Sequence, residues 1–156
     1  MSFTLTTPVT GGAQTGLTSP TYTIAADTAP TSSGKQYAVT ALGGTQTGVD
    51  STSSPSRPFT VTLSRQAVLS ALSAVDPVTG TLRSVPRNKY TVLVRKGVTP
   101  LAGQAPVPLL AKLEISVPAG ADSADAANVR AAMSLLIGSL NQISASIGDT
   151  LVTGVI

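Results

Sequence analysis

Basic residues are concentrated in the middle of this chain. Residues 57–112 carry eight basic residues against one acidic residue, whereas the segments before and after them are slightly negative. Within this region, five basic residues fall inside 14 consecutive positions that hold no Asp or Glu: Arg83, Arg87, Lys89, Arg95 and Lys96. Guanidinium and ammonium groups pair with phosphates, so the cluster indicates a surface facing a polyanion. A solvated sheet face is the alternative, and charge alone does not decide between them.

Catalytic chemistry has little support in this composition. The chain contains no His and no Cys, which removes the commonest general base and the thiolate nucleophile. Neither glycine pair has phosphate-loop spacing, and no acidic cluster has calcium-loop spacing. Four aspartates lie in turn-like contexts that explain them without chemistry: Asp27, Asp50, Asp76 and Asp149. We therefore expect no enzyme, no catalytic residue, no metal site, no cofactor and no small-molecule substrate.

The chain also gives no sign of export or membrane insertion. Its first residues lack the basic region and apolar run of a secretion signal, and no stretch of about 18 apolar residues occurs. The absence of Cys excludes disulfides. We expect no membrane partner, and a protein that stays in the cytoplasm where it is made or leaves as part of a particle. At 156 residues it is expected to form one domain, 1–156.

Three segments alternate as half-buried strands do, and they position the polar residues. They are 59–65, part of 82–96, and 109–117. One face would be apolar, formed by Phe59, Val61, Leu63, Tyr90, Val92, Val94, Leu113, Ile115 and Val117. The other would carry hydroxyls and cations, from Thr60, Thr62, Ser64, Lys89, Thr91, Arg95 and Lys112. Hydroxyls and amines on a flat sheet suit phosphate and 2′-OH contacts, which favours nucleic acid.

The rest of the first 120 residues is rich in strand and turn signals. Runs 3–10 and 17–25 predict an N-terminal hairpin, and 35–42 predicts a third strand. Segment 66–75 fits either a strand continuation or a short helix. Loops are predicted where Gly, Ser, Thr and Pro gather, at 43–58 and 97–108. The expected parts are an N-terminal hairpin (1–26), an antiparallel sheet (35–118) and C-terminal helices (122–156).

The last third changes to a helical pattern. Asp122 and Ser123 offer caps, and a helix is predicted from Ala126 to about Asn141. Its apolar stripe consists of Val129, Met133, Leu136, Leu140 and Ile143, widened by Ile137. A helix of this length covers a strip roughly 30 Å by 10 Å, whereas five strands make a sheet roughly 20 Å or more across. One helix cannot cover such a face, so we expect an obligate oligomer.

The order of these elements resembles the coat proteins of small single-stranded RNA bacteriophages, the levivirus group. The resemblance is carried by residues 88–94, by 110–118 and by the helix from 128 through 140. It implies an α+β fold, with an N-terminal β-hairpin, an antiparallel sheet of about five further strands and two C-terminal α-helices that interlock with a dimer partner. It also implies a non-enzymatic capsid protein of the virion, assembled in the cytoplasm of a bacterial host.

The resemblance further implies partners and sites. The partners would be a second copy in a homodimer, an icosahedral shell commonly of about 180 copies, and single-stranded genomic RNA on the inner sheet face. Together with the basic cluster, it gives the RNA-binding set Thr60, Thr62, Ser64, Arg83, Arg87, Lys89, Thr91, Leu93, Arg95, Leu110 and Lys112. The dimer interface would include Val129, Met133, Leu136, Ile137, Leu140 and Ile143. A quasi-equivalent loop would contain Gly97, Pro100, Gly103, Pro106 and Pro108.

Two features qualify these expectations. Leu93 and Leu110 stand where better-known relatives have Lys and Tyr, so general RNA packaging is expected more than recognition of one RNA hairpin.

The composition also fits an alternative, a secreted or surface-displayed β-rich fibre or pilus-like module. Ser and Thr richness and scarce charge would suit that module, which would bind no RNA.

Overall fold

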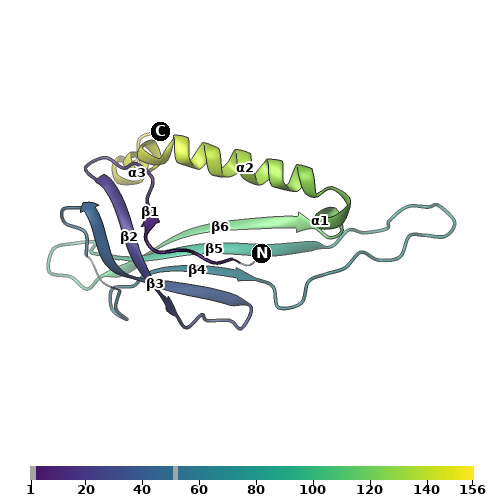
Figure 1. Cartoon of the computed structure of the whole chain (residues 1–156), viewed down its shortest axis with the longest axis horizontal. Coiled ribbons are helices and arrows are strands. Elements are labelled where there is room, and N and C mark those ends of the chain that lie inside the picture. The colour runs from purple at the N-terminus through teal and green to yellow at the C-terminus, as the bar shows by residue number, and fades with distance from the viewer. Residues whose placement is uncertain (1–2, 51–52) are drawn as a thin grey trace.

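The computed structural model describes residues 3–50 and 53–156, which form a six-stranded sheet followed by three helices (Figure 1). The strands are β1 (Val9–Thr10), β2 (Thr18–Asp27), β3 (Gly34–Thr45), β4 (Phe59–Arg65), β5 (Arg87–Val98) and β6 (Val107–Pro118). The helices are α1 (Ala121–Ala124), α2 (Ala126–Gln142) and α3 (Ser144–Thr153). Each strand pairs antiparallel with the next along the chain, so β6 forms one edge of the sheet. The predicted α+β class is confirmed.

The register of the central strands confirms the predicted division into two faces. Val61 lies opposite Val94 on β5, and Leu63 lies opposite Val92, which in turn lies opposite Leu113 on β6. Because residues paired across a sheet point to the same side, these apolar side chains form one face. The intervening residues form the other face, which carries the hydroxyls and most of the cations.

The N-terminal segment lies on the apolar face. The ring of Phe3 meets that of Tyr90 edge-on, with centroids 6.5 Å apart, and Tyr22 meets Phe59 in the same way at 5.6 Å. The turn before β2 is tied to α3, because Gln14 Nε2 donates a hydrogen bond to the carbonyl of Ser144 at 2.8 Å. The first hairpin is shorter than predicted, since β1 has two residues, and β2 serves both the hairpin and the main sheet.

The helices pack little against their own chain. In Figure 1, α2 runs back along the length of the sheet above β6. Within α2 and α3, whose residues the structure describes in full, none is buried. The bounds of α2 agree with the prediction, but the predicted caps do not form: neither Asp122 nor Ser123 caps a helix. Gly120 and Asp125 hold the N-cap positions of α1 and α2, without side-chain cap bonds. None of the described helices is long and apolar enough to cross a membrane.

The core of one chain is small. Among the described residues the buried apolar side chains are Ile24, Val39, Leu63 and Ala119, together with Pro20. The chain exposes 10,513 Å² to solvent. A folded monomer of its mass would expose roughly 7,200 Å². The excess of about 3,300 Å² is surface that a compact monomer of this size would normally bury.

Segment 66–86 differs from the prediction. Residues 66–75 form neither strand nor helix; they belong to an extended arm between β4 and β5 that projects beyond the end of the sheet (Figure 1). The loops predicted at 43–58 and 97–108 are shorter than expected, because β3 continues to Thr45, β5 to Val98, and β6 begins at Val107. Residues 51–52 of the first loop lie outside the described residues.

The turn between β6 and α1 gives a test of how the arm is held. Gly120 has φ 85°, and a Cβ added to it would overlap the side chain of Leu72 on the arm. Gly120→Ala should therefore lower the free energy of unfolding by about 2–3 kcal/mol, through backbone strain and the displaced leucine. Gly103→Ala is the matched control. It also has positive φ but meets no atom within 4 Å, so it should cost about 1 kcal/mol. Equal losses in urea denaturation would show that Leu72 does not pack tightly there.

Candidate nucleic-acid interface

The polar face of β4, β5 and β6 brings most of the predicted RNA-binding residues together. The register aligns them in rows across the three strands: Thr60, Arg95 and Leu110; Thr62, Leu93 and Lys112; Ser64, Thr91 and Glu114. The rows continue onto β3, where Gln36 lies opposite Thr62 and Ala38 opposite Thr60. A half-exposed antiparallel sheet places alternate residues on one side, which is why short sequence runs could predict this face.

The exposed part of this face lies near β6 and carries two lysines around one glutamate. Lys89 Nζ and Lys112 Nζ lie 3.2 Å and 3.0 Å from the Glu114 carboxylate. Hydrogen bonds from Lys112 and then Lys89 hold the pKa of the Glu114 carboxyl below its usual value. The two lysine side chains remain 62% and 55% exposed. Exposed ion pairs contribute little stability, so either lysine can exchange its partner for a phosphate at small cost.

A second, more buried part of the polar face lies towards β3. There Thr60 and Thr62, predicted to contact RNA, bond to other side chains of the protein. Thr60 and Thr62 are each 4% exposed. Arg95 donates from Nε to Thr60 Oγ1 and from Nη2 to Gln36 Oε1, both at 3.1 Å. Thr62 Oγ1 donates to the same Gln36 oxygen at 2.8 Å. Both hydroxyls are therefore engaged inside the protein, and their role here is to hold Arg95 in place.

The network ends at a carboxylate on β2. Gln36 Nε2 donates to Asp27 Oδ2 at 2.6 Å. Hydrogen bonds from the Gln36 amide and from the Thr28 backbone N–H lower the pKa of Asp27, with a smaller contribution from the charge of Arg95. Sequence analysis had not assigned Gln36 to this face. The alternation of residues 35–42, with Tyr37 and Val39 on the apolar side, was the signal that could have placed it there.

An open hollow of about 890 Å³ lies beside this network. It is lined by residues that include Gln36, Thr60, Arg95, several of the 53–58 loop, Pro106, Pro108 and Leu110. The hollow places an arginine, an amide and a leucine within reach of one ligand. Among the described residues, no group of three or more acidic, His or Cys side chains could hold a metal ion.

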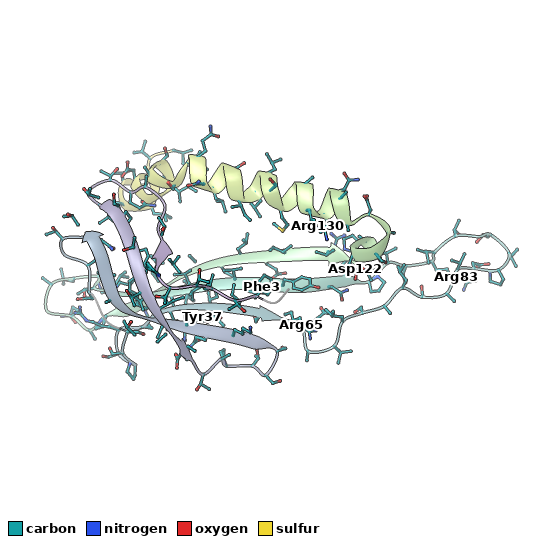
Figure 2. The ribbon with its side chains drawn as sticks, in the orientation of Figure 1. Phe3, Tyr37, Arg65, Arg83, Asp122 and Arg130 are labelled. Carbon is teal, nitrogen blue, oxygen red and sulfur yellow. The ribbon has the colours of Figure 1, made fainter. Side chains whose placement is uncertain are left out.

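Arg87 and Arg83 have different positions. Arg87 lies on the polar face at the start of β5, where it donates from Nε to Ser116 Oγ at 2.9 Å and from Nη2 to the Ser116 carbonyl at 3.0 Å. Arg83 does not lie on the sheet. It sits on the projecting arm, well away from Arg65 and Arg130 (Figure 2), and pairs with Asp76 at 2.9 Å. The structure therefore does not bring Arg83 to the candidate interface.

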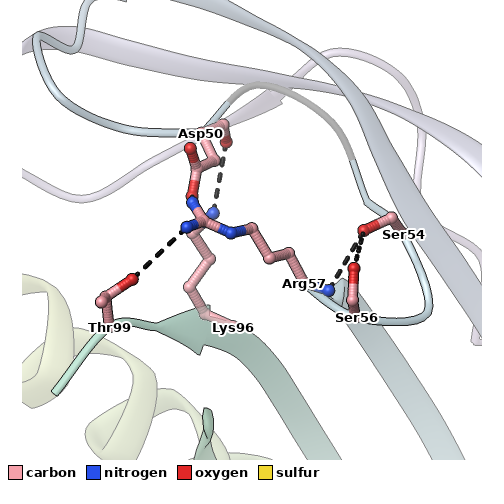
Figure 3. A network of polar contacts seen from close by, with 6 residues as sticks. All are labelled: Asp50, Ser54, Ser56, Arg57, Lys96 and Thr99. Carbon is pink, nitrogen blue, oxygen red and sulfur yellow. Dashed lines mark hydrogen bonds and ion pairs between the residues drawn. The ribbon is translucent and has the colours of Figure 1, made fainter. Parts of the chain in front are cut away.

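Lys96, a member of the basic cluster, lies on the opposite face. Its Nζ is 4.3 Å from the centroid of the Phe59 ring and donates to the carbonyl of Asp50 at 3.2 Å. Burial lowers the pKa of Lys96. Next to it, Arg57 pairs with Asp50 at 2.6 Å and reaches Thr99, so the cluster ties the 46–58 loop to the end of β5 (Figure 3). Lys96 has a structural role here.

The residues predicted for a dimer interface lie along one side of α2. Val129, Met133 and Leu136 are half-buried, whereas Ile137, Leu140 and Ile143 are 64%, 41% and 45% exposed. In the predicted quasi-equivalent loop, Pro100, Gly103 and Pro106 lie in the 99–106 connection, while Gly97 and Pro108 face each other at the ends of β5 and β6.

Comparison with known proteins places this architecture. No family model and no curated protein matches the chain. Among solved structures, the virus-like particle of bacteriophage ESE020 superposes with a TM-score of 0.95 and 54% sequence identity, over 99% of this chain and 100% of that one. The virus-like particle of Beihai levi-like virus 32 is far more distant, with a TM-score of 0.45 and 18% identity over 86% of this chain and 88% of that one. Because the first match is more than half identical over essentially the whole length, the chain belongs to the coat-protein family of small single-stranded RNA bacteriophages.

Proposed function

We propose that this protein is the structural subunit of a virion shell that packages single-stranded RNA. Two copies would interlock as a dimer, and dimers would assemble into a closed icosahedral shell in the cytoplasm of the bacterial host. The observation that carries the proposal is an apolar helix, α2, without a single buried residue, in a chain matched over its full length by a virus-like-particle protein. This role needs no catalytic group, in keeping with a chain that lacks His and Cys.

The free edge of β6 supports dimer formation by strand pairing. β6 has 12 residues, bonds to β5 on one side, and has no strand partner on its other side within the described chain. A long unpaired edge is a template for another strand, and proteins normally cover it. Antiparallel pairing of β6 with the β6 of a second copy would join two six-stranded sheets into one, with a two-fold axis between them. The resemblance implied an N-terminal hairpin and about five further strands per copy, whereas each copy here has six strands in one sheet, β1 and β2 of the hairpin included.

The same pairing would cover the helices. In the joined sheet, α2 of each copy would cross above the partner's strands, where its apolar stripe could reach an apolar sheet face. The surface excess of about 3,300 Å² per chain leaves ample area for this contact, because obligate dimers bury about 2,000–5,000 Å² in total. We infer that Val129, Met133, Leu136, Ile137, Leu140 and Ile143 lie in the interface between the two copies.

The face away from the helices would line the shell and meet RNA. Four basic residues, Arg87, Lys89, Arg95 and Lys112, share it with two carboxylates, Asp27 and Glu114. The surplus of two positive charges suits phosphate binding without sequence preference, which depends on salt concentration. Ser64 and Thr91 add hydroxyls, and Leu93 and Leu110 add apolar surface for bases. Thr60 and Thr62 would act through Arg95 and not by direct contact.

The 99–106 connection would lie at the symmetry axes of the shell. It contains Pro100, Gly103 and Pro106, joins β5 to β6, and is exposed apart from Pro106, which is half-buried. We propose a shell of about 180 copies, in which this connection adapts to slightly different surroundings.

The helix contact can be tested by placing one charge on either side of α2. Leu136→Asp should abolish dimers and particles, because an unpaired carboxylate in a dry contact costs several kcal/mol. Ser134→Asp adds the same charge on the opposite side of the helix and should assemble normally. Size-exclusion chromatography and electron microscopy give the readout. Normal particles from Leu136→Asp would exclude the interlocked dimer.

The RNA face can be tested with two opposite charge changes. Lys89→Glu should leave dimers intact but lower the RNA content of the particles, because it turns a phosphate partner into a repelling group. Glu114→Gln should raise RNA affinity several-fold at low salt, because it frees Lys89 and Lys112 from their shared partner. Both are measured by the 260/280 nm absorbance ratio and by RNA titration of dimers at two salt concentrations. If neither variant changes RNA binding, this face is not the one that meets RNA.

A further inference from the structure

The arm between β4 and β5, residues 66–86, is the largest feature that the proposed dimer does not explain. It projects past the end of the sheet, and Arg83 lies near its far end (Figure 2). Seven of its apolar side chains are between 38% and 91% exposed: Val68, Leu69, Leu72, Val75, Val78, Leu82 and Val85. Soluble proteins rarely leave so many apolar side chains together in solvent unless another surface covers them.

The base of the arm is fixed to the sheet. Asn88 is 8% exposed, and its Oδ1 accepts hydrogen bonds from the Ser70 backbone N–H at 2.7 Å and from Gln66 Nε2 at 2.9 Å. Its Nδ2 donates to the Ser70 carbonyl at 3.1 Å. Further along, the side chain of Leu72 lies against Gly120, in a space that any Cβ would fill. The arm therefore leaves the body in a fixed direction.

The tip of the arm is also ordered by its own contacts. The Asp76 carboxylate accepts from the backbone N–H groups of Val78 at 2.9 Å and Thr79 at 3.2 Å. Arg83 donates to the other carboxylate oxygen from Nε at 3.1 Å and from Nη2 at 2.9 Å. The Asp76 N–H donates to the Thr81 carbonyl at 2.9 Å. These bonds hold Val78, 91% exposed, at the apex of a preformed turn, so little ordering entropy is lost when the tip binds.

Charge favours a protein partner for the arm over RNA. Asp76 and Arg83 are the ionisable residues between 66 and 86, and they pair with each other, so the segment has no net charge. Phosphate binding needs unpaired cations. A neutral, apolar and preformed tip suits an apolar protein surface instead.

The direction of the arm indicates which copy it would reach. Pairing through β6 adds a partner beside the sheet, whereas the arm continues beyond the end of the strands (Figure 1). The coat protein of the ESE020 particle superposes over its whole length and 99% of this chain, a match that extends over the arm. We propose that the arm is a docking element that binds an apolar surface on another copy of this chain, in a neighbouring dimer of the shell. This inference rests on the proposed function, since it presupposes assembly into a shell.

The test is a charge at the apex. Val78→Asp in the full-length chain should leave dimers intact, with unchanged thermal stability, because the side chain is exposed in the free protein. It should raise the dimer concentration needed for half-maximal particle assembly by at least about tenfold, the factor that corresponds to about 1.4 kcal/mol. Val78→Ile keeps the apolar character and should assemble like the unmodified chain. Light scattering and analytical ultracentrifugation measure both.

Each other outcome overturns the inference in a distinguishable way. Assembly of Val78→Asp at the same concentration as the unmodified chain would show that the apex docks on no other copy. Loss of the dimer itself would place the arm inside the dimer and not between dimers. Unchanged assembly with lower RNA content would assign the arm to RNA. If the unmodified chain forms no particles, the proposed function fails first, whatever the variant does.

Discussion

The structure depends on apolar surface that one chain cannot bury by itself. Five described apolar side chains are buried in a protein of 156 residues, and its longest helix buries none. Hydrophobic burial is the main favourable term in folding, so in the proposed dimer a second copy would supply much of the burial that one chain lacks. The free edge of β6, the uncovered side of α2 and the apolar arm are three surfaces that one chain leaves open, and the proposed assembly would cover all three. In the proposed dimer, folding and dimer formation would therefore be coupled, and shell assembly would follow as a separate step.

The polar face shows how one surface can serve both stability and binding. Near β3 its hydroxyl, amide and guanidinium groups are satisfied by one another, through Thr60, Thr62, Gln36 and Arg95. Buried polar groups need such partners, because an unpaired one costs free energy. Near β6 the lysines are exposed and share one carboxylate, so they can exchange partners. The inner part fixes the geometry of the sheet, and in the proposed shell the outer part would meet a phosphate backbone.

Much of the architecture could be predicted because it follows local patterns. Strict alternation of apolar and polar residues predicted the bounds of β4 and the two faces of β5 and β6. The spacing of Val129, Met133 and Leu136 predicted α2. What could not be predicted depends on contacts between distant segments. The burial of Thr60 and Thr62 requires Gln36 and Arg95 from two other strands. The apolar residues of the arm follow no helical or strand spacing. The arm is held by Asn88 at the start of β5 and by Gly120 after β6. Arg83 and Lys96 were placed in the basic cluster by sequence proximity alone. Arg83 lies on the arm between β4 and β5, and the alternation of side chains along β5 puts Lys96 on the apolar face.

The pairing of β6 with a second copy is the central claim, and amide hydrogen exchange along β6 tests it most directly. In an antiparallel edge strand, alternate N–H groups bond to the neighbour and the others point outwards to solvent. The measurement compares these two sets in the assembled protein, residue by residue between Val107 and Val117. The account predicts that both sets exchange slowly, since a second strand would occupy the outer side. Fast exchange at every second residue, with slow exchange only at those bonded to β5, would show that the edge stays free and would contradict the account.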